Sequence, residues 1–211
     1  MKKGDIKKAL VKLEEGNVEA LIKEGLQSGI EPNSILIELQ EGLNEIGVLF
    51  EKGEMYVPEL IFAGNIMKKN MELLKPLLKS GFIGGKGKII LGTVFGDVHD
   101  IGKDIVKTLL EGSGYEVLDL GTNVEPERFV DSIRESGARI VGLSALLTIS
   151  FESIANTVEA IKKAGYRDLV KIMVGGAPVT DLVAKKTGCD FYGKDAYEGL
   201  KYANKVYGHT N

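Results

Sequence analysis

The sequence predicts an α/β protein in two parts, a bundle of four helices followed by a doubly wound parallel sheet. Apolar residues recur at helical spacing through residues 1–80, whereas short apolar runs alternate with helical stretches after residue 88. Most of the 27 glycines also lie after position 80. We therefore expect a helical domain at 1–80, a hinge at 81–87 and an α/β domain at 88–211.

The helical part contains four amphipathic segments. Their apolar residues include Ile6, Leu10 and Leu13 in the first, Val18, Leu21, Ile22 and Leu26 in the second, and Ile35, Leu36, Leu39, Leu43, Ile46, Leu49 and Phe50 in the third. The fourth runs through “VPELIFAGNIMKKNMELLKPLLKSG”. Each segment ends near a glycine, as helices often do, at Gly16, Gly29, Gly53 and Gly81. Short links between such helices favour a small bundle.

The glycine-rich stretch “GFIGGKGK” then predicts a hinge. After it come five short apolar runs, which we expect to be strands, at 88–94, 116–121, 139–145, 171–176 and 189–193. Helical stretches follow them at 102–112, 125–136, 150–164, 178–187 and 195–206. This alternation is typical of a parallel sheet covered on both faces, as in the flavodoxin-like (Rossmann-like) folds. Such folds bind ligands beyond the carboxyl ends of their strands, so the loops at those ends are the candidate site.

Composition excludes several classes of protein. The net charge of −3 gives no electrostatic footprint for nucleic acid. Cys189 is the single cysteine, so neither a disulfide framework nor a thiolate metal cluster is expected. The chain has no apolar run long enough for a membrane span and no apolar segment behind its charged start. We expect a cytoplasmic protein that binds neither nucleic acid nor membranes.

The loop after the first predicted strand, “GDVHDIGKDIV”, contains His99, one of two histidines. A neutral imidazole is a common metal ligand, and it usually donates its second ring N–H to a carboxylate, a role for which Asp97 is placed. A zinc site needs further ligands, and the other histidine is His209 near the end of the sequence. One protein ligand therefore suits a metal already held by a macrocycle. The alternative is an ordinary loop in which Asp100 caps the next helix.

Two further loops at this edge are polar or glycine-rich. Ser144, Thr148 and Ser150 surround the end of the third predicted strand, and Gly175–Gly176 end the fourth. Paired glycines let another group approach the backbone. The alternatives are an N-cap at Ser150 and a tight turn before a helix with Pro178 in its first turn.

Taken together, three motifs resemble the signature of cobalamin-binding domains. They are Asp97-x-His99-x-x-Gly102, Ser144-x-Leu146 and Gly175–Gly176. The loops are similar to those of methionine synthase and of the corrinoid proteins of methyltransferase systems. The segment “GEMYVPELIFAGNIM” (53–67) is similar to the cap helices of that family, so the resemblance covers nearly the whole chain.

The resemblance implies a role for each residue of the first loop. His99 would coordinate cobalt on the lower axial face, in place of the cofactor's own dimethylbenzimidazole. Asp97 would hydrogen-bond His99, and Ser150 would hydrogen-bond Asp97, giving a relay that shifts charge on the ligand as cobalt changes oxidation state. The backbone around the underside of the corrin would come from Gly96, Val98 and Asp100.

The resemblance also implies a slot for the displaced nucleotide tail and a cap over the upper face. Ser144 and Thr148 resemble residues that contact the tail, Gly175–Gly176 would give it room, and Ala196 would line the same slot. Tyr56 and Ile66 match cap positions over the corrin. The alternative for these last two is a place in the core of the bundle.

A corrinoid methyl carrier is the function that the resemblance implies. The chain would accept a methyl group on Co(I) from a donor-specific methyltransferase and pass it from methyl-Co(III) to an acceptor methyltransferase, with a reductive activase as a third partner. The donor would be a methylamine, a betaine, methanol or a methoxylated aromatic, and the acceptor a thiol or tetrahydrofolate. The chain alone is not expected to turn over. The alternatives are a cobalamin-dependent sensor, the small subunit of a cobalamin mutase, and a flavodoxin-like or receiver domain without metal.

Overall fold

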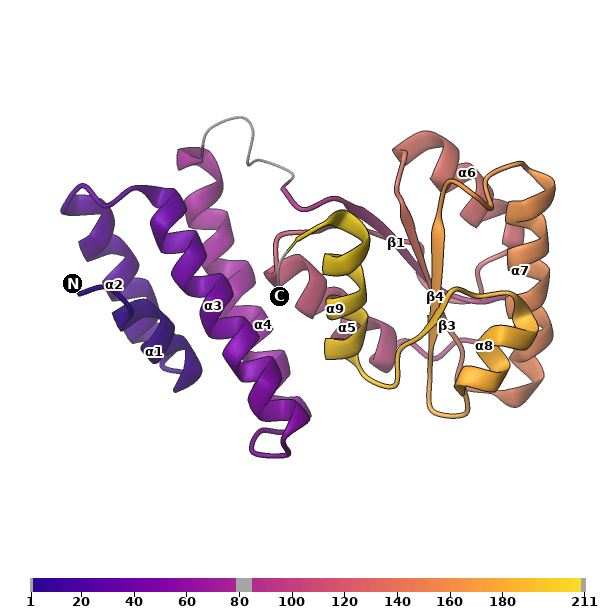
Figure 1. Cartoon of the computed structure of the whole chain (residues 1–211), viewed down its shortest axis with the longest axis horizontal. Helices are drawn as coiled ribbons and strands as arrows, with labels where there is room; N and C mark the ends of the chain where they lie inside the picture. The colour runs from indigo at the N-terminus through magenta and orange to yellow at the C-terminus, as the bar shows by residue number, and fades with distance from the viewer. Residues whose placement is uncertain (1, 79–84, 210–211) are drawn as a thin grey trace. The chain divides into compact units, whose positions relative to one another are not determined.

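The structure, a computed structural model, describes residues 2–78 and 85–209. It divides into two compact units: one runs up to Gly85 and includes Glu111–Gly114, and the other comprises Lys86–Leu110 and the chain from Tyr115 onward. The predicted fold class is confirmed, since helices precede a five-stranded parallel sheet (Figure 1). The predicted hinge at 81–87 falls mostly outside the described residues, as does Gly81, and the domain boundaries at 80 and 88 stay predictions.

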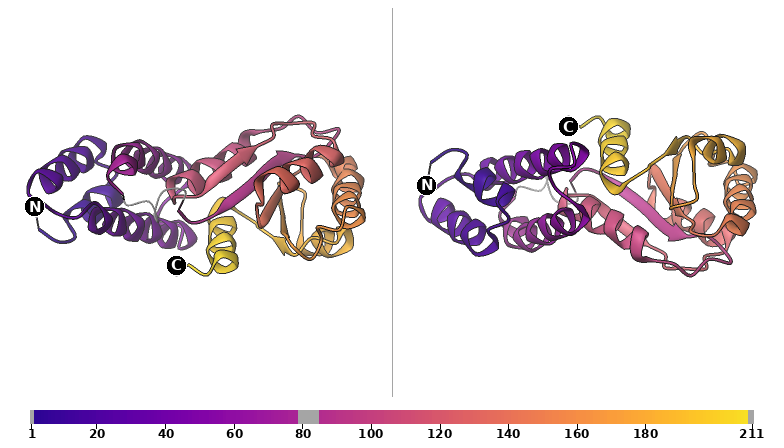
Figure 2. Two further views of the ribbon diagram at one scale, coloured as in Figure 1. Left: turned by 90° about the horizontal axis from the view of Figure 1, so that it is seen from above. Right: turned by 90° about the horizontal axis from the view of Figure 1, so that it is seen from below.

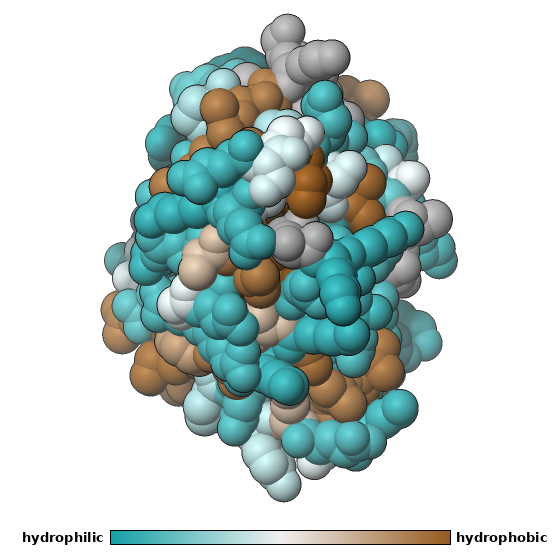
Figure 3. Space-filling model, turned by 90° about the vertical axis from the view of Figure 1, so that its left-hand side faces the viewer, coloured by the Kyte–Doolittle hydropathy of each residue, from teal (hydrophilic) through white to brown (hydrophobic). Residues whose placement is uncertain are grey.

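The helical unit consists of α1 (Asp5–Val11), α2 (Glu15–Gln27), α3 (Pro32–Glu51) and α4 (Val57–Leu74), followed by a short 3-10 helix at Lys75–Leu77. Its helices bury the apolar positions that the periodicity predicts, among them Ile6, Leu10, Ile22, Ile35 and Leu39. Glu38 of α3 is also buried. Its carboxylate accepts hydrogen bonds from the N–H groups of Gly4 and Ile6 at the start of α1. On the face seen in Figure 3, apolar side chains lie interspersed among hydrophilic ones.

The predicted end of the first helix at Gly16 is wrong. α1 ends at Val11, and Gly16 lies inside α2. The reason is a tight reversal at Leu13, which has a left-handed φ of 59° and whose N–H donates to the carbonyl of Leu10. A leucine is rarely found in this conformation, so the sequence carries no signal for the reversal. Gly29 and Gly53 do follow α2 and α3 with positive φ, as predicted.

The sheet has the strand order β2-β1-β3-β4-β5, and all neighbouring strands are parallel. The strands are β1 (Lys88–Thr93), β2 (Glu116–Asp119), β3 (Ile140–Ser144), β4 (Lys171–Gly175) and β5 (Phe191–Tyr192). The helices are α5 (Ile101–Gly112), α6 (Pro126–Ser136), α7 (Phe151–Lys163), α8 (Asp181–Thr187) and α9 (Ala196–Tyr207). α5 and α9 cover one face of the sheet, and α6, α7 and α8 cover the other (Figures 1 and 2).

The strand order reverses between β1 and β3, because β1 leads to β2 on one side while β3 lies on its other side. The register aligns Thr93 with Ser144 and Ser144 with Gly175. The loops that follow β1, β3 and β4 therefore leave the sheet side by side at its carboxyl edge. This is the position where open α/β sheets bind their ligands.

Helix α8 begins later than predicted. Pro178 precedes the helix instead of lying in its first turn, because Thr180 is the N-cap and its hydroxyl accepts a hydrogen bond from the N–H of Val183. Within the described part of the chain, each helix is too short or too polar to span a bilayer.

Candidate functional site

Asp97 lies fully buried in the loop that follows β1, and its carboxylate is surrounded by hydrogen-bond donors. Oδ1 is 2.7 Å from Nδ1 of His99 and accepts from the His99 N–H at 3.1 Å. Oδ2 accepts from the N–H groups of Leu146 and Leu147 at 2.7 and 3.1 Å. Burial by itself would raise the pKa of Asp97, but the bonds from the His99 ring and from these N–H groups lower it to about 2. The carboxylate is therefore ionised at neutral pH.

His99 is held by that charge at one ring nitrogen only. An ionised carboxylate only accepts hydrogen bonds, so Nδ1 of His99 carries a proton. In the neutral ring Nε2 then keeps its lone pair, which is the form in which imidazole binds a metal. The His99 side chain is 46% exposed, so the ring stands out from the protein while its base is fixed.

Ser150 joins the same carboxylate. It is buried, and its hydroxyl donates to Oδ2 of Asp97 at 3.3 Å. Ser150 occupies the N-cap position of α7, yet its side chain makes no capping hydrogen bond. The geometry thus favours the predicted Asp97 contact over the alternative of a helix cap. Thr148 begins the 3-10 helix Thr148–Ser150 and is exposed, while Ser144 at the end of β3 is partly buried.

Sequence reasoning missed two residues that fix this loop. The buried Thr93 at the end of β1 donates its hydroxyl to the carbonyl of His99 at 2.8 Å. Asn123 in the loop after β2 donates its N–H to the carbonyl of Asp97, and its side-chain oxygen accepts the N–H of Gly96, both at 2.8 Å. Asn123 has a left-handed φ of 53°, a conformation that asparagine tolerates. Its place in a loop at the binding edge was the one available signal.

The two loops that meet at Asp97 expose several large apolar side chains. Val98 and Ile101 flank the histidine in the sequence, and both are well exposed. The loop after β3 adds the exposed side chains of Leu146, Leu147 and Ile149, and Leu146 and Leu147 are the residues whose N–H groups bind Asp97. Water contact of so many large apolar side chains is unfavourable, and such patches mark binding surfaces. A broad, mostly apolar ligand with one metal ion fits this combination of donor and surroundings.

The four glycines of the predicted site differ in whether a side chain would fit at their positions. At Gly176, with a φ of 133°, a Cβ would lie 1.8 Å from the carbonyl oxygen of Ala145. At Gly175 it would lie 3.2 Å from the carbonyl oxygen of Gly193. The protein's own backbone thus accounts for both, and room for a nucleotide tail stays a prediction. Gly96 has a φ of 80°, and at Gly102 in the first turn of α5 a Cβ would meet open space.

The remaining predicted residues have different exposures. Asp100 directly precedes α5, and its carbonyl accepts the N–H of Asp104 in the first turn. Ala196 is the buried first residue of α9. In the helical unit Tyr56 is 67% exposed, whereas Ile66 is 1% exposed and is covered by protein. The core alternative therefore fits Ile66, and a surface role fits Tyr56.

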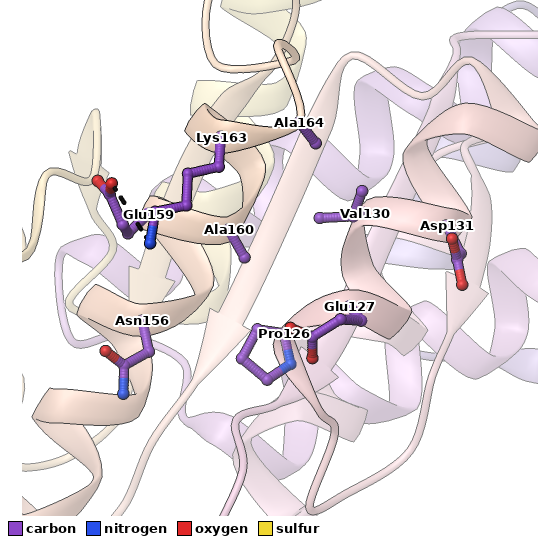
Figure 4. A pocket seen from close by; sticks show the side chains of 9 residues that line it. All are labelled: Pro126, Glu127, Val130, Asp131, Asn156, Glu159, Ala160, Lys163 and Ala164. Atoms are coloured by element: carbon purple, nitrogen blue, oxygen red, sulfur yellow. Dashed lines mark ion pairs between the residues drawn. The ribbon is translucent and has the colours of Figure 1, made fainter.

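A separate groove lies between α6 and α7 (Figure 4). It is lined by those two helices and by Ala164, which follows α7. Its polar side chains include Glu127 and Asp131 of α6 and the pair Glu159–Lys163 of α7, whose charged atoms are 3.9 Å apart. These residues do not form part of the predicted site, and the His99 edge remains the candidate site.

Comparison with known proteins identifies the ligand. The family described as B12 binding domain matches residues 87–201, which include the whole His99 edge, and a second family of that description matches residues 4–75. The dimethylamine corrinoid protein of Methanosarcina barkeri is 38% identical over 200 residues, which cover 94% of this chain and 93% of the relative.

Two solved structures are similar over nearly their full length. A cobalamin-binding protein from Desulfitobacterium hafniense has a TM-score of 0.84 and 35% identity, covering 97% of this chain and 98% of that one. The monomethylamine corrinoid protein of Methanosarcina barkeri has a TM-score of 0.55 and 31% identity, covering 95% and 96%. The chain therefore belongs to the corrinoid proteins with B12-binding domains, and it binds cobalamin or a related corrinoid.

Proposed function

We propose that this chain carries a methyl group on a bound corrinoid between two methyltransferases in the cytoplasm. The support is its similarity over nearly the whole length to corrinoid proteins named for dimethylamine and monomethylamine. The same names favour a methylamine as the donor over a betaine, methanol or a methoxylated aromatic. The acceptor would be a thiol or tetrahydrofolate.

The observation that carries the proposal is the Asp97–His99 pair. Asp97 fixes the proton on Nδ1 and leaves Nε2 of the partly exposed His99 side chain free to bind a metal, on a loop that also exposes Val98 and Ile101. When bound, the corrinoid supplies a cobalt ion that takes up and releases the methyl group. His99 would be the lower ligand of that ion, and the charge on Asp97 makes the imidazole a stronger donor.

Other residues of the edge would hold the cofactor without taking part in the chemistry. The backbone of Gly96, Val98 and Asp100 would lie against the corrin, with Gly102 and Leu146 beside it. Ser144, Thr148, Gly175, Gly176 and Ala196 would receive the nucleotide tail. Tyr56 would contribute to an apolar cover that excludes water, which a readily oxidised cobalt requires, and Ile66 would support it from within the bundle.

Among the described residues of the His99 edge, none is left to activate a methyl donor or acceptor, and the proposed partners follow from this. Asp97 is engaged by its donors, and His99 is directed at the cofactor, so activation of an amine or a thiol falls to other proteins. We infer a donor methyltransferase, an acceptor methyltransferase and a reductive activase, and no turnover by the chain alone.

A single-turnover experiment tests the proposal. Purified protein is loaded with hydroxocobalamin, reduced chemically and mixed with dimethylamine and a dimethylamine methyltransferase from Methanosarcina barkeri. We expect monomethylamine in amounts stoichiometric with the loaded protein. Monomethylamine and methanol, each with its own methyltransferase, serve as comparison donors. If none of these three donors is demethylated although the corrinoid is bound and reduced, the proposed transfer from a methylamine is wrong.

A further inference from the structure

An ion pair between a buried lysine and a partly buried aspartate lies close to the His99 loop. Lys103 is in the first turn of α5, and its side chain is only 3% exposed. Its Nζ donates to Oδ1 of Asp119, the last residue of β2, at 2.8 Å and to Oδ1 of Asp104 at 2.6 Å. Burial by itself would lower the pKa of Lys103, but these carboxylates raise it above its usual value. The ammonium group is therefore charged, and it binds two carboxylates.

From Asp119 a continuous series of hydrogen bonds leads back to His99. Oδ1 of Asp119 also accepts the N–H of Gly121 at 3.0 Å. The carbonyl of Gly121 accepts the N–H of Thr93 at 2.9 Å, and the hydroxyl of Thr93 donates to the carbonyl of His99. These hydrogen bonds thus connect Lys103 of α5 to the backbone of His99.

The loop between β1 and α5 is also bound at its start by the chain that follows β2. Asn123 binds the carbonyl of Asp97 and the N–H of Gly96, at the entry to the His99 segment. Lys103 binds Asp119 at its exit. The segment between β1 and α5 is therefore held at its start by the loop after β2 and at its end by β2 itself. Lys103 binds Asp119 there from the first turn of α5, and Lys107 of the same helix binds the other carboxylate oxygen at 2.9 Å.

We propose that Lys103 is a positioning residue for His99, whose ion pair with Asp119 fixes the start of α5 and thereby the direction of the imidazole. Removing one partner of such a pair lowers stability, so the position of the imidazole has to be read separately from stability. A ligand ring must be held to within about 0.5 Å to meet its metal ion, and helix α5 begins two residues after His99. The inference rests on the proposed function, because it takes His99 as the residue that faces the cofactor.

The test is Lys103→Met, which keeps the length of the side chain and removes its charge. The first readout is the Nδ1–H proton of His99 in histidine-labelled apoprotein, observed by NMR and assigned with His209→Gln. We expect this signal to broaden or disappear, because the ring no longer keeps one position against Asp97. The second readout is the 15N-dependent nitrogen splitting in the EPR spectrum of the reduced, cobalamin-loaded protein labelled with 15N-histidine. We expect it to weaken, with a roughly 10-fold loss of corrinoid affinity, as outer-shell changes at metal sites produce.

Tyr115→Phe is the matched control. It removes a buried hydrogen bond to Asn204, 2.8 Å long, next to the opposite end of β2. It should lower stability without changing the His99 signal. If Lys103→Met fails to fold, Asp119→Asn removes the same pair from the other side. A folded variant of either kind that keeps the wild-type His99 signal overturns the inference. If the wild-type protein retains no corrinoid, the proposed function fails, while the apoprotein signal still decides the role of Lys103.

Discussion

The N–H of Leu146 donates to Oδ2 of Asp97 at 2.7 Å, across 49 positions of the sequence. The bond joins the loop after β3 to the loop after β1, so Asp97 does more than orient His99. Its buried charge is the point at which two loops of the candidate site meet. The same two loops carry the exposed apolar side chains around the histidine.

Asp97→Asn should therefore destabilise the α/β unit and not only the cofactor site. An amide places an NH2 group where the carboxylate accepted N–H donors, so a buried donor is left without a partner. We expect the free energy of unfolding to fall by about 2–4 kcal/mol in urea denaturation of the apoprotein. Asp100→Asn, at an exposed neighbour, is the control and should change it by less than about 0.5 kcal/mol. If the two substitutions lowered the free energy of unfolding equally, Asp97 would not stabilise the contact between the two loops.

His99→Ala should leave the fold intact and change the environment of the cobalt. We expect corrinoid to be retained with weaker affinity, because the apolar surface and the tail contacts remain. In protein labelled with 15N-histidine, the nitrogen splitting in the EPR spectrum of the reduced wild type should take the 15N pattern, since its source is the imidazole. His209→Ala should keep this change, and His99→Ala should lose it. A wild-type splitting that does not respond to the label would remove His99 as the ligand.

Ser150→Ala separates a bond to Asp97 from a helix cap. The Asp97 bond is long, at 3.3 Å, and other donors satisfy the carboxylate. We expect a loss of about 0.5–1 kcal/mol in unfolding free energy, measured in urea, and a measurable shift of the His99 Nδ1–H signal. Thr180→Ala, which removes an observed cap on α8, should cost about 1 kcal/mol and leave that signal in place. No shift in Ser150→Ala would mean that the serine does not act on the pair.

Two glycines of the site should respond oppositely to alanine. Gly176→Ala places a methyl group 1.8 Å from the Ala145 carbonyl, at a φ of 133°, so we expect a loss above about 3 kcal/mol or failure to fold. Gly102→Ala meets open space in a helix and should raise stability by about 0.5–1 kcal/mol. Thermal unfolding of the apoproteins measures both. If the corrin packs on Gly102, the alanine variant should also bind it more weakly, and unchanged affinity would exclude that contact.

Asp119 should make a defined contribution to acid stability. Burial by itself would raise its pKa from 3.8, but the bonds from Lys103, Gly121 and Lys107 lower it to about 2. A carboxyl group whose pKa is lowered in the folded state stabilises the fold at pH values above its ordinary pKa. This stabilisation is lost as the pH falls from 3.8 to about 2. Allowing for solvent screening, we expect about 1–2 kcal/mol.

Asp119→Asn should remove that contribution. Its unfolding free energy, measured in urea at a series of pH values, should be lower at neutral pH and should fall less steeply on acidification. Asp168→Asn, at an exposed carboxyl, should keep the wild-type slope. A wild-type slope in Asp119→Asn would show that the ion pair is not formed in solution.

The order and type of the elements could be predicted because each is specified by local periodicity. The predicted strand at 88–94 is observed at Lys88–Thr93, and the predicted helix at 125–136 is observed at Pro126–Ser136. Prediction failed at the end of the first helix, because Leu13 adopts a left-handed backbone that leucine disfavours. It also failed at Pro178, where the cap at Thr180 competes successfully for the helix start.

The sequence by itself determined the two-part organisation, the family signature and the pairing of Asp97 with His99, because these depend on neighbours along the chain. Only the tertiary structure decided that the N–H groups of Leu146 and Leu147 complete the carboxylate's surroundings, that Thr93 and Asn123 fix the loop, and that Lys103 pairs with Asp119. These contacts join residues far apart in the sequence. They exist because parallel strands end at one edge of the sheet, and the register between strands, which no local pattern encodes, sets which loop residues meet there.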